Sequence, residues 1–291
     1  MNDTVVFIGI GTRRSGSSWL HSFLNKQTTI VKNEGGEHFF SENWSPNIDL
    51  FYKNLTNFTS QAKIVDLSVS YSYPDYANAV AKRIAEYCPN AKIFVIVRDP
   101  IDRMISDYRR GLSMFEIPKG TSLSEALSLH PELYTRSLYA SNLAQFYNLG
   151  FDVKVFQYEK LVHDPYHFQQ EIIEYFDIQN PTYIDPASNE KVGPAYVPKY
   201  QWLSKFIFVA KNTLRWIFNK AGCKNTWNNF TKRNQAFYQK LLLINSTKET
   251  HKFQIPETIH KEINADIELF RKMSNMSFSD WDINVHRTHK K

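Results

Sequence analysis

The sequence predicts an α/β fold in a single domain, with a central parallel sheet flanked by helices and a P-loop-like strand–loop–helix unit. Apolar runs of strand length alternate with segments of helical periodicity, which is the pattern of a doubly wound parallel sheet. One apolar run leads into a basic turn with glycines, and another ends in arginine before a helix that starts with proline. The 291 residues show no internal repeat or linker, so we expect one domain over 1–291.

The expected strands near 4–10 and 92–98 are short and almost continuous apolar runs, as in strands that are buried on both faces. We expect strands near 4–10, 63–67, 92–98 and 152–157. Between and after them apolar residues recur at helical spacing, which predicts helices near 17–26, 74–88, 100–113, 131–149 and 165–176. Asp99 is expected to cap the helix that begins at Pro100.

The turn after the first strand has the composition of an anion site. Gly9 and Gly11 permit backbone conformations that a side chain would prevent, and Gly16 lets the chain pass close to a ligand. The N–H groups and the positive dipole end of the next helix attract anions. We expect a phosphate-bearing ligand to be held by Arg13, Arg14, Ser15, Gly16, Ser17 and Ser18.

Two common phosphate motifs do not match this turn. Gly11 and Gly16 have the spacing of the nucleoside triphosphate loop, but Ser17 stands where that loop requires lysine. The dinucleotide fingerprint would need its third glycine at Arg14. An ATP-dependent kinase on a related fold therefore remains an alternative, but one that lacks the lysine that grips the phosphates.

A second anion site is predicted where the strand near 92–98 ends. Arg98 closes this strand, at the edge where open α/β sheets bind ligands. On the following helix, Arg103, Ser106 and Arg110 are spaced so that they share a face. We expect Arg98 and Ser106 to converge on one phosphate. Two anion sites in one domain predict a nucleotide with phosphates at both ends.

These residues resemble those of the PAPS-dependent sulfotransferases, where PAPS is 3′-phosphoadenosine-5′-phosphosulfate. Segment 14–20, Arg-Ser-Gly-Ser-Ser-Trp-Leu, resembles the loop that binds the 5′-phosphosulfate in that family. Segment 98–108 resembles the family's 3′-phosphate motif, R-x-P-x-x-R-x-x-S-x-Y, without a gap. Segment 136–139 is similar to a third family segment, and segment 278–281 resembles the ending of many carbohydrate-type members.

The resemblance implies a PAPS-dependent O-sulfotransferase that moves a sulfuryl group in line to a hydroxyl and uses no metal. Its product from the donor is adenosine 3′,5′-bisphosphate (PAP). It further implies that Arg98 and Ser106 hold the 3′-phosphate and that Tyr139 belongs to the cofactor site. Arg14 takes the place of a loop lysine that stabilises charge at the bridging oxygen in many members.

Sulfuryl transfer also needs a base that takes the proton of the acceptor hydroxyl. Segment 32–40 resembles the K-E-x-H-F-F segment of heparan-type and bacterial carbohydrate sulfotransferases, in which the glutamate is the base. At the position of that glutamate this chain has Gly36, with Glu34 and Glu37 on either side. The base is therefore one of these glutamates or His38, since a histidine side chain is a common general base. We favour Glu37, with His38 next; a non-catalytic nucleotide-binding protein is the other alternative.

Asp66 and Leu67 mark a second difference from the heparan-type relatives, which carry a lysine at the position of Leu67. Asp66 is expected to line the acceptor side or to orient Arg14 or His38. The missing lysine points away from heparan itself as the acceptor. We expect a hydroxyl of a carbohydrate or a glycolipid.

Composition and charge limit the partners. The net charge of +6 favours anionic ligands, yet the basic residues match no DNA- or RNA-binding module, so no nucleic-acid partner is expected. The 2 cysteines show no metal-ligand spacing. The sequence leads directly into its first strand without a signal or membrane-spanning segment, so we expect a cytoplasmic enzyme. Residues 199–220 are basic and amphipathic, which predicts a flap or a helix with peripheral membrane contact.

Overall fold

The computed structural model describes residues 5–32, 38–53, 63–185, 197–221 and 253–281, together with residues 223, 226, 234 and 246–247. Two compact units divide the chain. The first comprises Met1–Met104, His130–Gly193 and Ile255–Val285, and the second comprises Ile105–Leu129, Pro194–Gln254 and His286–Lys291. The single domain over the whole chain stays a prediction.

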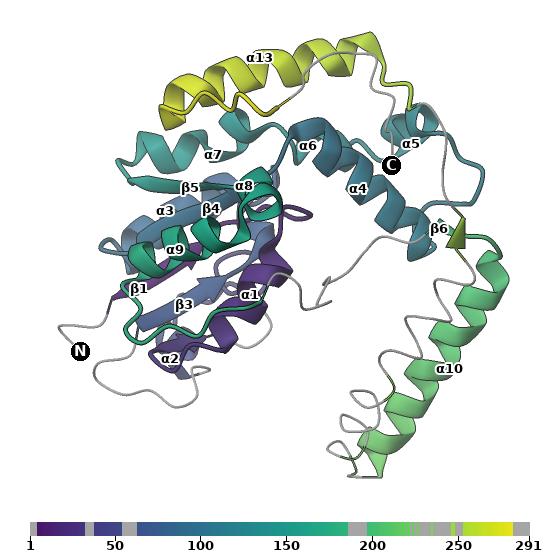
Figure 1. Cartoon of the computed structure of the whole chain (residues 1–291), viewed down its shortest axis with the longest axis horizontal. Coiled ribbons are helices and arrows are strands. Elements are labelled where there is room, and N and C mark those ends of the chain that lie inside the picture. The colour runs from purple at the N-terminus through teal and green to yellow at the C-terminus, as the bar shows by residue number, and fades with distance from the viewer. Residues whose placement is uncertain are drawn as a thin grey trace. The chain divides into compact units, whose positions relative to one another are not determined.

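A five-stranded parallel sheet forms the centre of the first unit (Figure 1). In spatial order its strands are β2 (Ile30–Lys32), β3 (Lys63–Leu67), β1 (Val6–Gly9), β4 (Lys92–Val97) and β5 (Val153–Gln157). The predicted α/β class is thus confirmed, with the predicted strands near their expected places. The sequence did not predict β2, because a strand of 3 residues is too short to show a period.

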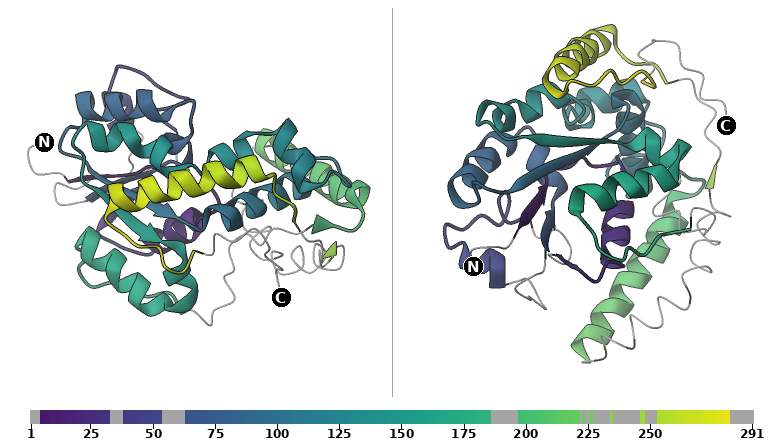
Figure 2. Two further views of the ribbon diagram at one scale, coloured as in Figure 1. Left: turned by 90° about the horizontal axis from the view of Figure 1, so that it is seen from above. Right: turned by 60° about the vertical axis from the view of Figure 1, so that its left-hand side comes forward.

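Helices cover both faces of this sheet, which is why its strands are apolar almost throughout (Figures 1 and 2). On one face, α1 (Ser17–Asn25) and α9 (Pro165–Phe176) enclose a core of sheet phenylalanines. The other face carries α3 (Ala77–Tyr87) and α7 (Tyr139–Asn148), which pack against each other. The remaining helices of this unit are α2 (Asp49–Lys53), the 3₁₀ helix η1 (Val69–Ser72), α6 (Glu132–Thr135), α8 (Tyr158–His163) and α13 (Glu257–Ser274).

The helix predicted near 131–149 is divided into α6 and α7, with Leu138 outside the helical conformation between them. The division has a polar cause. The Ser137 hydroxyl donates to Pro100 O at 3.0 Å, which holds the connecting segment against the start of α4 (Pro100–Ser113). Asp99 caps α4 as predicted, because its Oδ1 accepts from the amides of Ile101 and Asp102 at 3.0 Å.

A carboxylate joins α13 to the first turn of α7. Asp266 Oδ2 accepts from Ala140 N at 2.9 Å, and Asp266 Oδ1 accepts from Ser141 N at 2.9 Å and from Ser141 Oγ at 2.7 Å. Asp266 therefore caps a helix that lies far away in the sequence, and the amides that it satisfies are orphan donors of that helix.

Asp266→Ala is expected to lower the free energy of unfolding by about 1–3 kcal/mol, because it removes a helix cap and leaves buried donors unsatisfied. Urea denaturation measures the loss. Glu268→Ala is the matched control on the same helix, since the Glu268 side chain is 59% exposed and pairs only locally with Arg271. An Asp266 variant as stable as this control would contradict the capping role.

The second unit contains the last part of α4, α5 (Leu123–Leu129), α10 (Gln201–Lys220) and a small antiparallel sheet of β6 (Val197–Pro198) and β7 (Ser246–Thr247). Within it, the Tyr108 hydroxyl donates to Thr121 O at 2.7 Å. The helix predicted from residues 199–220 is present as α10, whereas its role as flap or membrane-facing helix stays a prediction. In the described parts of the chain, every helix is too short or too polar to cross a membrane.

Candidate nucleotide and acceptor site

The two loops that carry the predicted anion sites both leave the carboxyl end of the sheet. β1 and β4 are neighbours there, and the chain continues from them to opposite faces, through α1 on one side and toward α7 on the other. In open α/β sheets the carboxyl ends of two such strands are where ligands bind. The loop after β1 and the loop after β4 are therefore positioned to hold one ligand together.

The loop after β1 is fixed to β4 by Thr12. Its backbone N donates to Ile96 O at 2.9 Å, and its hydroxyl donates to the same oxygen at 3.0 Å. The hydroxyls of Thr12 and Ser15 lie 2.5 Å apart, and Ser15 is fully buried. Ser15 was predicted to hold the ligand, and the structure shows its hydroxyl bonded inside the loop, where it supports the loop's shape.

The end of this loop presents backbone amides at the start of α1. Arg14 (φ 72°) and Gly16 (φ 94°) adopt left-handed conformations that turn the chain into the helix. Gly16 is the N-cap and has no side chain to cap the helix; the first intrahelical bond runs from Leu20 N to Gly16 O. The amides of the first turn, including those of Ser17 and Ser18, thus precede the helical ladder and are suited to an anion.

Gly16→Ala is expected to weaken nucleotide binding at least about tenfold, equivalent to about 1.4 kcal/mol. An added Cβ would lie 2.9 Å from the Tyr158 ring, which stacks on Arg98. Gly120→Ala is the matched control, because Gly120 has the same φ of +94° but open space around it. Both variants are expected to lose about 1–2 kcal/mol of stability from strain, and only Gly16→Ala is expected to lose affinity in calorimetry.

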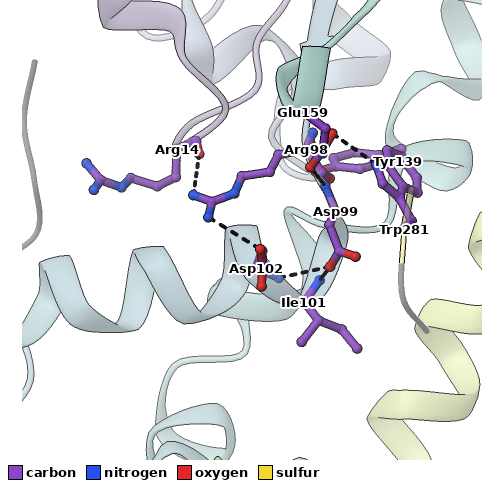
Figure 3. A network of polar contacts seen from close by, with 8 residues as sticks. All are labelled: Arg14, Arg98, Asp99, Ile101, Asp102, Tyr139, Glu159 and Trp281. Carbon is purple, nitrogen blue, oxygen red and sulfur yellow. Dashed lines mark hydrogen bonds and ion pairs between the residues drawn. The ribbon is translucent and has the colours of Figure 1, made fainter. Parts of the chain in front are cut away.

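Arg98 links the two loops (Figure 3). Its Nη1 donates to Arg14 O at 3.5 Å, and its Nη2 lies 3.5 Å from Asp102 Oδ2. The guanidinium lies over the Tyr158 ring at 4.9 Å from the centroid. Arg98 Nε is buried and has no hydrogen-bond partner among the described residues. A buried donor without a partner, at the carboxyl end of a sheet strand, points to a ligand atom that accepts its hydrogen bond. The Arg14 side chain extends away from Arg98.

Side chains from two other elements hold the backbone of Arg98 and Asp99 in place. The Tyr139 hydroxyl donates to Arg98 O at 2.7 Å, and burial raises the pKa of Tyr139 to about 12, so it remains a donor at ordinary pH. Glu159 Oε1 accepts from Asp99 N at 2.8 Å, and Glu159 Oε2 accepts from Trp281 Nε1 at 3.2 Å (Figure 3). Tyr139, predicted as a cofactor residue, is 1% exposed, and its hydroxyl contacts the Arg98 backbone.

Arg103 is a buried anchor. Its side chain is 0% exposed, its Nε donates to Ser137 Oγ at 2.5 Å, and its Nη2 donates to Leu133 O. The sequence placed Arg103 on a shared helix face with Ser106 and did not predict this burial. Ser106 follows on α4 and is half-buried. It belongs to the second unit, so its convergence with Arg98 stays a prediction.

His38 is held at the carboxyl end of β3, the strand beside β1. Its Nδ1 is hydrogen-bonded to Ser70 Oγ on η1, and Ser70 Oγ in turn lies 2.6 Å from Ser41 Oγ. With Nδ1 engaged in this way, Nε2 is the nitrogen through which His38 would exchange a proton with an acceptor. Glu34 and Glu37, the other candidates for the base, lie outside the described residues.

Asp66 supports the same segment from within. It is fully buried, its Oδ1 accepts from Ser68 Oγ at 3.1 Å, and its Oδ2 accepts from the Tyr71 hydroxyl at 2.6 Å. Burial and the Asp66 carboxylate raise the pKa of Tyr71 well above its usual range. The Tyr71 oxygen accepts from Phe40 N at 3.1 Å. Asp66 therefore does not line an open acceptor surface, because its oxygens fix the turn that follows His38.

A profile of the sulfotransferase domain matches residues 3–243. The chain belongs to the sulfotransferase domain family. Members of this family use PAPS as the donor of the sulfuryl group, so the predicted family and enzyme class are confirmed. Membership argues against the kinase alternative.

Named relatives match parts of this sulfotransferase. The membrane-associated sulfotransferase kil1 of Dictyostelium discoideum is 28% identical over 120 residues, which is 40% of this chain and 25% of that protein. Heparan sulfate glucosamine 3-O-sulfotransferase 5 of Mus musculus is 31% identical over 105 residues, which is 35% of this chain and 30% of that protein. The chain thus matches less than a third of the length of either relative.

A solved structure shares the fold of the whole sulfotransferase chain. The crystal structure of a sulfotransferase from Alicyclobacillus acidocaldarius aligns with a TM-score of 0.61 at 17% identity, over 97% of this chain and 99% of that one. At this identity the alignment shows a common fold, with the parallel sheet described above.

The residues of this sulfotransferase fit the phosphates of PAPS. The uncapped amides at the start of α1 and the unsatisfied Arg98 Nε are donors at neighbouring strand ends, and phosphate oxygens are acceptors. Among the described residues there is no cluster of three or more side chains suited to a metal ion.

Sequence reasoning missed Tyr158 and Glu159, which directly follow β5. The signal was available, because polar residues just after a buried strand reach the same edge as Arg98. Ser70 and Tyr71 were also given no role from the sequence, because their partners His38 and Phe40 lie some thirty residues earlier.

Proposed function

We propose that this sulfotransferase moves the sulfuryl group of PAPS in line to a hydroxyl of a carbohydrate or a glycolipid. One observation carries the nucleotide part of this proposal: Arg98, at the end of β4, donates to the backbone of Arg14 in the loop after β1. Two anion-binding loops in contact suit a nucleotide with phosphates at both ends.

PAPS, when bound, supplies the sulfuryl group, and the chain contributes binding, charge and proton transfer. Arg13, Arg14 and the amides of Gly16, Ser17 and Ser18 hold the 5′-phosphosulfate in this proposal. Arg98 and Ser106 hold the 3′-phosphate, and Tyr139 positions Arg98. Cations around phosphate oxygens stabilise the charge that develops as a phosphate group leaves, so the leaving group needs little protonation.

The acceptor proton is taken by Glu37 in this proposal, with His38 next and Glu34 third. The position of His38 supports a base in this segment. His38 lies at the carboxyl end of β3, and β3 is beside β1, the strand that leads into the first anion loop. The Asp66–Tyr71 pair holds the neighbouring turn rigid, and a rigid base is the more effective one.

A sugar acceptor is supported by the likeness of segment 32–40 to carbohydrate sulfotransferases and by the names of the heparan sulfate relatives. Leu67 replaces the lysine of heparan-type enzymes, which supports a carbohydrate other than heparan. A cytoplasmic location and the absence of a nucleic-acid partner remain predictions from the sequence.

Calorimetric titration with PAP, beside ATP with magnesium, tests the nucleotide. Tight binding of PAP with weak binding of ATP is expected, and preference for ATP would overturn the proposal. Transfer from radiolabelled PAPS to a panel of oligosaccharides, glycolipids, tyrosine peptides and phenols then tests the acceptor. Labelling of only the peptide or the phenol would refute the carbohydrate assignment while leaving the donor assignment intact. PAP binding without transfer to any acceptor would favour the non-catalytic alternative.

A further inference from the structure

The positive charge of this chain is concentrated in one segment. Residues 191–248 contain no aspartate or glutamate, whereas they contain eleven lysine and arginine residues. The whole chain has a net charge of +6, so the remainder of the chain is net negative. A segment with basic residues alone is attracted to an extended anionic partner.

Within this segment, α10 exposes large apolar side chains on one face. Trp202, Phe206, Val209, Trp216 and Ile217 follow one another at helical intervals and are between 47% and 71% exposed. At about 100° per residue they form a stripe about 100° wide. Apolar side chains of this size are normally buried, and a contiguous exposed group of them marks an interaction surface.

Basic side chains are exposed on the same helix as this apolar stripe. Lys205, Arg215 and Lys220 are exposed on α10, and the Lys220 ammonium lies 5.1 Å from the centroid of the Trp216 ring. Aromatic rings beside cations on a helix are typical of segments that lie in the interface of a bilayer, where the rings reach the acyl boundary and the cations meet phosphates.

We propose that α10 docks this protein peripherally on anionic lipid bilayers. The stripe from Trp202 to Ile217 enters the boundary between headgroups and acyl chains, and the flanking lysines and arginine pair with the lipid phosphates. This inference concerns the second unit, goes beyond sulfuryl transfer and does not depend on it.

Two other partners suit the observations less well. A nucleic acid would use the basic residues and stack bases on the aromatic rings, but Val209 and Ile217 offer nothing to a base or a phosphate. A second copy of the chain paired symmetrically through this helix would bring two segments without acidic residues together, and like charges repel.

Flotation of the full chain with vesicles tests the proposal. Vesicles of phosphatidylcholine alone are compared with vesicles that also contain phosphatidylserine. The partition coefficient is expected to be at least about tenfold larger with the anionic lipid and to fall as salt rises. Equal partition on both vesicles, or no partition on either, would overturn the proposal.

Three variants separate the apolar from the electrostatic contribution to vesicle binding. Replacing Trp202, Phe206 and Trp216 together by serine is expected to abolish flotation, and replacing them by phenylalanine, leucine and phenylalanine is expected to retain it. Replacing Lys205, Arg215 and Lys220 together by glutamine is expected to lower partition about a hundredfold, at about fivefold for each charge. Flotation that survives the serine variant would refute insertion of the stripe.

Matched controls come from α13 in the first unit. Leu269→Ser removes an apolar side chain that is 54% exposed, and Lys261→Gln removes a charge whose side chain is 74% exposed. Both are expected to float like the unaltered chain. Circular dichroism with urea denaturation confirms that each variant folds. Light scattering that shows a dimer dependent on the stripe, without flotation, would replace the bilayer by a second copy; capture by DNA without flotation would replace it by a nucleic acid.

Discussion

Arg98→Ala is expected to weaken PAP binding by at least about 30-fold, because losing one member of a desolvated, hydrogen-bonded charge pair costs about 2–5 kcal/mol. The guanidinium bridges the loop after β1 and the start of α4, and its Nε is a buried donor without a partner among the described residues. Calorimetry measures the change. Arg98→Lys is expected to recover only part of the affinity, since lysine lacks the planar fork.

Two controls separate phosphate binding from structural damage. Asp102→Asn removes the carboxylate that lies 3.5 Å from Arg98 but leaves the guanidinium in place, so affinity is expected to stay or rise. Lys261→Ala removes an exposed cation that pairs with Glu257 on α13, and affinity is expected to stay unchanged. Unchanged affinity in Arg98→Ala itself would refute its assignment to the 3′-phosphate.

Glu37→Gln is expected to lower turnover by a factor of about 10²–10⁴ while PAP affinity stays the same, because a general base acts on the acceptor and not on the nucleotide. Turnover is measured at saturating PAPS with the acceptor that the transfer screen identifies. Calorimetry with PAP on the same preparation shows that the cofactor site is intact.

His38→Ala and Glu34→Gln complete this comparison. If His38 is the base, Ser70→Ala is also expected to reduce turnover, because the Ser70 hydroxyl holds the His38 ring through Nδ1. If Glu37 is the base, Ser70→Ala is expected to have a small effect. Normal turnover in all three variants of Glu37, His38 and Glu34 would exclude the whole segment as the source of the base.

The sheet could be predicted from the sequence because its strands are covered on both faces. Burial on both faces leaves a continuous apolar run at β1 and β4, and such a run is visible without any knowledge of neighbours. The short β2 pairs only with β3 and leaves no such signal. The gap between α6 and α7 was also invisible, because it depends on a contact between Ser137 and Pro100.

The anion loops were predictable for a related reason. Glycines with positive φ and an arginine at a strand end are local requirements, so Gly16 and Arg98 show in the sequence itself. The roles of Arg103 and Tyr139 are different in kind, since each depends on a partner from another element. Spacing alone assigned Arg103 to a polar helix face, and tertiary contacts placed it in the interior.

The bond between Trp281 and Glu159 has a consequence for the timing of folding on the ribosome. Glu159 holds the amide of Asp99, and Trp281 reaches Glu159 from the last described residues of the chain. During synthesis the loop that carries Arg98 therefore waits for its final support until residue 281 has left the exit tunnel. A nascent chain that stops before residue 281 contains both anion loops but lacks the bond from Trp281 that holds Glu159 beside Asp99.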